Sequence, residues 1–86
     1  MASVTGYVQS MFIDPGSEFA KVAIGPSPTD AQLLLVMMDS SDTAQELAVK
    51  TALIYMFSTA YASRREVTAE YSTTDSQVSY FEIFRP

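Results

Sequence analysis

Several residue types that carry much of protein chemistry are absent from this sequence. Its 86 residues include no cysteine, no histidine and no tryptophan. The chain therefore has no thiol nucleophile and no imidazole general base, and it cannot form a histidine or thiolate metal site. Carboxylates remain as ligands for a hard cation, yet no stretch spaces them like a calcium-binding loop. We expect neither a metal nor a cofactor.

Positive charge is also scarce. Five cations stand against ten acidic residues, which leaves a net charge of -5. Because phosphate backbones are bound by a basic stripe, we expect no nucleic-acid partner.

The absence of cysteine argues against a disulfide-stapled secreted domain. No basic segment precedes an apolar run near the first residue, so we expect no secretory signal in the chain as written, and both a cytoplasmic protein and the mature form of an exported one stay open.

Length and composition predict one globular domain over residues 1–86, since 48% of the residues are hydrophobic. Both alternating faces of residues 4–13 are largely apolar or aromatic, which predicts a strand covered on both sides. Asp14-Pro15-Gly16-Ser17 then supplies turn chemistry. A second strand is expected over residues 18–24.

Three further strands are predicted, one before and two after a predicted helix. Two prolines within residues 25–28 predict a loop. The run AQLLLVMM, residues 31–38, predicts a deeply buried third strand. Residues 66–72 and 77–84 predict two last strands, joined by a polar hairpin loop.

The clearest helix signal spans about residues 43–63. Thr43 with Glu46 forms one possible capping box, and Asp42 with Gln45 forms another one residue earlier. Two arginines follow the expected end and complement the helix dipole. The element order is therefore β-β-β-α-β-β in a mostly β chain of the α+β class.

The predicted helix has unusually few charges on its outer side. A helical wheel places one face on the sheet, formed by Val49, Ala52, Leu53, Met56, Phe57 and Ala60. From residue 51 to residue 63 there is no charged side chain. A large weakly polar surface on a small chain favours association. We therefore expect another copy of the chain to cover Leu47, Thr51, Ile54, Tyr55, Ser58 and Tyr61.

Two alternatives to this interface exist. The helix could be buried between two layers of its own chain, although 86 residues supply few further elements to cover it. A membrane span is disfavoured by Glu46 and Lys50 within the helix.

Candidate binding residues gather at the first turn. Asp14, Ser17 and Glu18 offer hydrogen bonds to a sugar or a peptide, and Phe19 offers a ring for stacking. A solvated turn without a ligand explains the same residues. Three aromatic residues of the last two strands could also stack on a ligand, or simply pack in the core: Tyr71, Tyr80 and Phe81. The pair Arg64 and Arg65 is explained by the helix dipole.

Paired carboxylates give no convincing catalytic site. Glu66 and Glu70 lie four residues apart on a predicted strand, hence roughly 13 Å apart, which is too far for joint acid-base chemistry. Asp39 and Asp42 precede the helix, where carboxylates are common capping groups. We expect a protein that is not an enzyme.

The order β-β-β-α-β-β in so short a chain matches the five-stranded OB-fold barrel, with its helix between the third and fourth strands. Ser3-Val4-Thr5-Gly6 with Val8, the pair Glu18-Phe19 after the turn, and the closing Ile83-Phe84-Arg85 resemble the corresponding parts of the Shiga-toxin B subunits. That family consists of pentameric OB-fold lectins of bacterial AB toxins. The resemblance implies an OB-fold subunit that closes into a ring, most plausibly a pentamer, with helices around its axis.

The sequence departs from that family at its disulfide and its receptor site. Ser3 and about Thr73 stand where the family has bridged cysteines, and Pro15 and Gly16 occupy a turn that is acidic in the family. The family also uses a tryptophan that this chain lacks. The sugar site is therefore not carried over.

We expect a ring-forming, non-catalytic module that binds a carbohydrate or a protein partner. A structural or adaptor ring of a phage or secretion assembly is the alternative. A single-stranded nucleic-acid OB module is a third, which the acidic charge disfavours.

Overall fold

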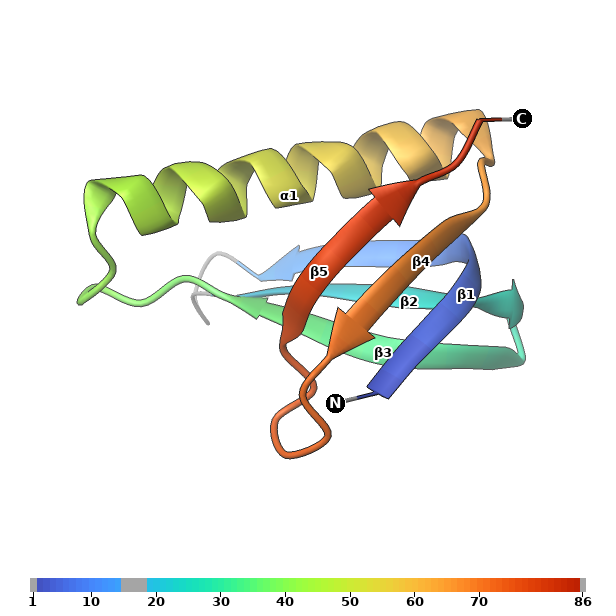
Figure 1. Ribbon diagram of the computed structural model, residues 1–86, viewed down its shortest axis with the longest axis horizontal. Coiled ribbons are helices and arrows are strands. Elements are labelled where there is room, and N and C mark those ends of the chain that lie inside the picture. Colours follow the sequence, from blue (N-terminus) through green and yellow to red (C-terminus); the bar gives the residue numbers. More distant parts are fainter. Residues whose placement is uncertain (1, 15–18, 86) are drawn as a thin grey trace.

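The computed structural model describes residues 2–14 and 19–85, and places them in a five-stranded antiparallel sheet and one long helix (Figure 1). The elements are β1 (Ala2–Asp14), β2 (Phe19–Ser27), β3 (Asp30–Met37), α1 (Ala44–Ser63), β4 (Val67–Tyr71) and β5 (Val78–Ile83). The order across the sheet is β3-β2-β1-β4-β5. The predicted element order and the α+β class are confirmed.

The long strand β1 belongs to both halves of the sheet. Its residues 2–6 pair with β4, and its residues 7–14 pair with β2. The sheet therefore curls around β1, and the two halves face the same interior (Figure 1).

The curled sheet does not close into the barrel that the sequence led us to expect. Its two edge strands meet at an isolated parallel bridge between Leu35 and Gln77, where the Leu35 N–H donates to the Ser76 carbonyl at 2.8 Å. Beyond this point β3 and β5 diverge (Figure 1). The result is an open curved sheet with its helix lying across the opening.

Two glycines allow neighbouring strands to approach closely where the sheet curls. A Cβ built on Gly6 would lie 2.8 Å from the Cα of Gly25, and one built on Gly25 would lie 2.6 Å from the Cα of Ala31. Real side chains do not approach backbone atoms so closely. The ladder shifts register nearby, and the Gln9 side-chain amide donates to the Gly25 carbonyl at 2.9 Å. Three strands can therefore approach each other here only because neither glycine carries a side chain.

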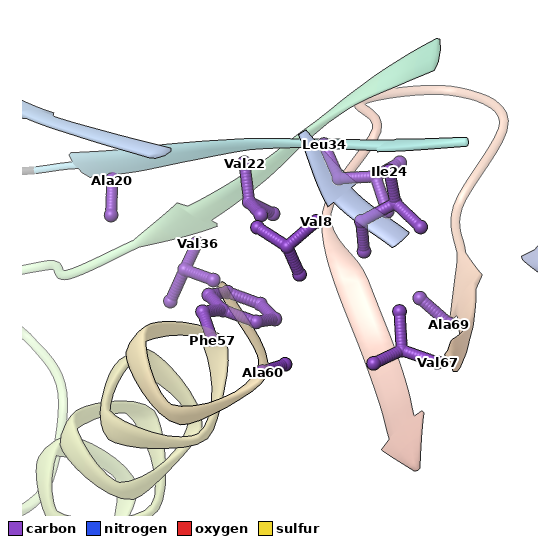
Figure 2. Close-up of a cluster of buried hydrophobic side chains, with 10 residues drawn as sticks. All are labelled: Val8, Ala20, Val22, Ile24, Leu34, Val36, Phe57, Ala60, Val67 and Ala69. Carbon is purple, nitrogen blue, oxygen red and sulfur yellow. The ribbon is translucent and has the colours of Figure 1, made fainter. Parts of the chain in front are cut away.

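The core fills the space between the curled sheet and the second half of α1. Figure 2 shows its side chains pointing inward from the strands and from the helix. Phe57 packs edge to face on Phe81 of β5, with ring centroids 4.7 Å apart and an interplanar angle of 87°. The buried residues are Val8, Ala20, Val22, Ile24, Leu34, Val36, Phe57, Ala60, Val67 and Ala69.

The helix begins at the first of the two predicted capping boxes. The Glu46 N–H donates to the Thr43 hydroxyl at 3.1 Å, and the Thr43 N–H donates to the Glu46 carboxylate at 3.0 Å. Asp42 instead pairs with Lys50. The helix ends at Arg64, which adopts a left-handed backbone (φ 54°) and donates its N–H to the Ala60 carbonyl.

Strand β2 is longer than expected. It runs to Ser27 through Pro26, whereas the two prolines predict a loop there. The ladder between β2 and β3 shifts register between Ile24 and Ser27. A register shift accommodates a proline, because the missing N–H falls where regular pairing is already interrupted.

The prediction that the first and third strands are buried is wrong for both, because only one face of each strand is covered. In β3 the inward Leu34 and Val36 are buried, but Leu33 and Met37 are exposed. In β1 Val8 is buried while Phe12 is exposed. Both strands are covered on their inner face, and nothing among residues 2–14 and 19–85 covers the outer one.

The predicted sheet-facing side of the helix is only partly correct. Phe57 and Ala60 are buried, and Leu53 packs against the core. Val49, however, is 63% exposed. The first half of α1 therefore stands away from the sheet, whereas the second half is packed onto it.

We expect the substitution Gly6→Ala to destabilise the fold by about 1–3 kcal/mol, the usual cost of overpacking. The added methyl would meet the backbone of Gly25, which cannot rotate away as a side chain would. Urea denaturation would measure the free energy of unfolding. Ser10→Ala, at an exposed position of the same strand, should stay close to wild type. Equal stability of the two variants would contradict the close approach.

Candidate functional site

The predicted ligand site at the first turn is described only at its margins. Asp14 is the last residue of β1 and Phe19 the first of β2, and the two are paired in the ladder. Ser17 and Glu18 lie outside the described residues. Of the four candidates, only Phe19 therefore has a side chain that can be placed.

Phe19 belongs to a cluster of two aromatic rings around one cation. The Lys21 ammonium lies 5.3 Å from the centre of the Phe19 ring and 5.8 Å from that of Phe12. Phe12 and Lys21 are cross-strand partners, so both point to the outer face of the sheet. Sequence reasoning missed both residues, although strand alternation alone places Phe19 and Lys21 on one face.

This cluster is part of a wider apolar surface on the outer face of β1, β2 and β3. Phe19 pairs with Met37, and Lys21 pairs with Leu35, so these side chains share one face. Leu33 continues the surface and is 49% exposed. We call this set the sheet surface; it consists of Phe12, Phe19, Lys21, Leu33, Leu35 and Met37.

The residues predicted for a subunit interface lie along the opposite layer of the protein. We call them the helix surface: Leu47, Thr51, Ile54, Tyr55, Ser58 and Tyr61. Five of the six are exposed, with Tyr55 at 74%, while Ile54 is half-buried against the core. The position of these residues is consistent with an interface, which stays a prediction.

The two aliphatic hydroxyls of the helix surface, on Thr51 and Ser58, have acceptors within the protein. Thr51 donates to the Leu47 carbonyl at 2.8 Å, and Ser58 donates to the Ile54 carbonyl at 3.3 Å. These donors are satisfied without water. Together with the absence of charge, this makes the surface easy to desolvate.

A groove of about 550 Å³ separates the first half of α1 from the diverging parts of β3 and β5. Its apolar walls include Val36, Val49, Leu53, Met56, Val78 and Phe81. This size falls within the range of small-ligand sites. The groove opens because the first half of the helix is not packed onto the sheet.

Several polar groups beside the groove are paired with each other. Lys50 and Asp42 form an ion pair at 2.7 Å. The Tyr80 hydroxyl donates to Glu82 at 3.0 Å. The Gln77 amide donates to Asp75 at 3.0 Å. The lining therefore offers chiefly apolar contact, with no arrangement of nucleophile and base.

Local hydrogen bonds shift the pKa values of three carboxylates and one tyrosine. The hydrogen bond from Lys50 is the main cause that lowers the pKa of Asp42. The backbone N–H of Ser41 lowers the pKa of Asp39, and that of Gln77 lowers the pKa of Asp75. The hydrogen bond to Glu82 raises the pKa of Tyr80. In each carboxylate the charged form is stabilised by a turn or a cap, as expected for structural groups.

The remaining predicted residues do not converge on one site. Phe81 packs on Phe57, and Tyr71 lies against the core. Glu66 immediately precedes β4, and Glu70 lies near the other end of that strand. Within residues 2–14 and 19–85, no three acidic side chains gather where they could hold a metal ion. No helix in this part of the chain is long and apolar enough to cross a membrane.

Comparison with known proteins found no matching family model, no matching curated protein and no matching solved structure. The resemblance to the Shiga-toxin B subunits therefore depends on the sequence motifs alone.

We expect Asp42→Asn to lower the free energy of unfolding at neutral pH, and the difference from wild type to shrink in acid. The folded pKa of Asp42 lies below its ordinary value of 3.8, so the stabilisation is fully present above pH 3.8. It is lost as the pH falls through the folded pKa.

Urea denaturation over a series of pH values would test this expectation. Asp30→Asn, an exposed carboxylate at the start of β3, is the control. A difference between wild type and Asp42→Asn that is constant with pH would contradict it.

Proposed function

We propose that this protein is a homo-oligomeric, non-catalytic binding module built on an OB-fold subunit. The main support is the exposure of a helix that carries no charged residue after Lys50. Only Phe57 and Ala60 of the 20 residues of α1 are buried, and Tyr55 projects into solvent. Such a surface on a small chain favours association with another copy.

The OB-fold assignment is supported by topology. The helix connects β3 to β4, and β1 pairs with both β2 and β4. The parallel bridge between Leu35 and Gln77 lies where a five-stranded barrel would close. OB-folds are partly open barrels, so a short bridge with a gap beside it is compatible with this assignment.

A ring, with five subunits favoured, is supported by the motifs shared with the Shiga-toxin B subunits. These are the Val4-Thr5-Gly6 segment and the closing Ile83-Phe84-Arg85. A ring of small subunits presents several identical sites at once, and such multivalency raises avidity without any new contact.

The proposed ligand is a carbohydrate or a protein partner bound at the first turn. Phe19 and Phe12 offer ring faces, and Lys21 offers a hydrogen-bond donor between them. Rings with a nearby polar group suit a sugar or an extended polypeptide. The runner-up is a structural or adaptor ring of a phage or secretion assembly, in which the same surface contacts another polypeptide.

We expect the protein in solution to have a mass that is a multiple of 9.4 kDa, five times that value for a pentamer. Tyr61→Glu should reduce the mass to that of one chain, because burying an unpaired carboxylate in an interface is costly. Light scattering or sedimentation at micromolar concentration would measure both.

Val49→Glu is the matched control for this experiment. It places the same charge on the same helix at an exposed position that faces the groove instead. Its mass should equal that of wild type. A wild-type mass of 9.4 kDa would contradict the oligomer.

A glycan array separates carbohydrate binding from an adaptor role. We expect specific binding that Phe19→Ala weakens about 10-fold or more, in line with the loss of one stacking contact. Tyr80→Ala, on β5 and away from the turn, should bind like wild type. An array without specific binding would favour the adaptor ring.

A single-stranded DNA titration at low salt would test the third alternative, a single-stranded nucleic-acid OB module, since phosphate contacts strengthen as screening falls.

A further inference from the structure

The open side of the curled sheet leaves the first part of β5 beside the groove. Residues 36–37 of β3 and residues 78–81 of β5 line this groove of about 550 Å³ together with α1. The two strands are joined at the bridge between Leu35 and Gln77 and diverge beyond it (Figure 1). Among residues 2–14 and 19–85, β4 is therefore the one strand that pairs along β5.

The backbone groups of Phe81 point toward the free edge of β5. The Phe84 N–H donates to the Glu66 carbonyl at 2.9 Å, so the backbone groups of Phe84 point toward β4. Backbone groups alternate between the two sides of a strand, and the pairing of residues 80–83 with β4 has no register shift. The N–H and C=O of Phe81 therefore point away from β4. An edge of this kind is a template for a further strand.

The inner face beside this edge is apolar. Phe81 packs on Phe57 and therefore points inward. Val49, Leu53 and Met56 of α1 form the facing wall of the groove, and Val49 is 63% exposed. Alternate side chains of a strand added beside Phe81 would point to the same inner face and cover this wall. A small apolar ligand would cover the wall too, but it would leave the backbone edge unused.

The outer face of the same edge is acidic. Tyr80 and Glu82 alternate with Phe81, so both point outward, and both are exposed. The Tyr80 hydroxyl donates to the Glu82 carboxylate at 3.0 Å, and Glu70 is the cross-strand partner of Tyr80. Basic side chains on an added strand would be complementary to these two carboxylates. The β5 strand of a second copy would instead bring like charges together.

We propose that β5 binds an extended polypeptide segment of a partner protein, which adds a strand to the free edge of β5 over the groove. Apolar side chains at alternate positions of this segment enter the groove, and basic side chains at the intervening positions lie beside Glu70 and Glu82. Main-chain hydrogen bonds then supply affinity, and the groove supplies specificity for alternate side chains. This site uses other residues than the proposed ligand site around Phe19, and it does not require the oligomer.

Short synthetic peptides with blocked ends test this site. In the first peptide lysine alternates with valine, and in the second the same residues form one block of lysines and one block of valines. Fluorescence anisotropy measures the dissociation constant of each. The alternating peptide should bind at least about 10-fold more tightly, because only alternation places its valines together on the groove side while the total charge stays the same.

Methylation of the peptide backbone separates strand addition from binding by side chains alone. Two further versions of the alternating peptide carry methyl groups on all valine nitrogens or on all lysine nitrogens. Because backbone N–H groups alternate along a strand, one of these sets faces β5. That version should bind about 10-fold or more weakly, since it loses several hydrogen bonds.

Amide hydrogen exchange followed by NMR locates the new hydrogen bonds. The Phe81 N–H should exchange quickly in the free protein and slowly in the complex with the alternating peptide. The Tyr80 N–H is the internal control. It points toward β4, as Phe84 does, and should be protected in both states.

Two pairs of variants test the two faces of the edge. Val49→Lys places a charge in the groove and should weaken binding about 10-fold, whereas Ala48→Lys adds the same charge to the same helix outside the groove lining and should not. Glu82→Gln should weaken binding about 2- to 5-fold, as expected for an exposed ion pair. Asp30→Asn removes the same charge elsewhere and should bind like wild type. Circular dichroism establishes that each variant is folded.

The possible outcomes are distinct. Protection of the Phe81 N–H together with weaker binding of one methylated peptide supports strand addition. Equal binding of all alternating versions overturns it and indicates a groove that holds side chains alone. Equal binding of the alternating and block peptides, or binding of neither, overturns it as well. A Phe81 N–H that is protected without peptide and loses protection on dilution overturns it in favour of a second copy at this edge. The mass of the protein in solution tests the proposed oligomer separately.

Discussion

The packing of Phe57 against the curled sheet is the contact on which the rest of this structure depends. Its ring is buried edge to face on Phe81 of β5, and Ala60 one turn later lets the helix approach closely. The first half of α1 has no equivalent anchor. The helix is therefore held along one half only, and the groove beside its first half follows from that asymmetry.

The placement of charge keeps these surfaces available for contact. Near the start of α1, Lys50 and Asp42 neutralise each other, and Glu46 is engaged in the capping box. From residue 51 onward the helix is uncharged. On the sheet surface Lys21 lies between two aromatic rings. An acidic chain thus confines most of its charge to loops and edges, which leaves the helix surface and the sheet surface with little charge to desolvate.

Sequence reasoning succeeded where the signal is local and failed where it depends on a neighbour. The helix and its Thr43 capping box were predicted correctly, because capping involves residues three apart. The extension of β2 through Pro26 was missed, since the register shift that accommodates it is a property of the pairing with β3. Of the candidate binding residues, Phe19 was identified, but its neighbours Phe12 and Lys21 were not. Their grouping depends on cross-strand register, which no single stretch of sequence contains.

The sequence by itself determined the order of strands and helix, the start of α1 to within one residue, and the absence of charge along the exposed side of the helix after Lys50. These follow from the periodicity of apolar residues, turn chemistry and capping, all of which act within a few residues. Only the tertiary structure decided which face of each strand is covered, that β3 and β5 diverge after one bridge, and that Gly6 and Gly25 meet. Each of these requires segments far apart in the chain to lie side by side, and an alternating strand has the same pattern whichever of its faces meets the core.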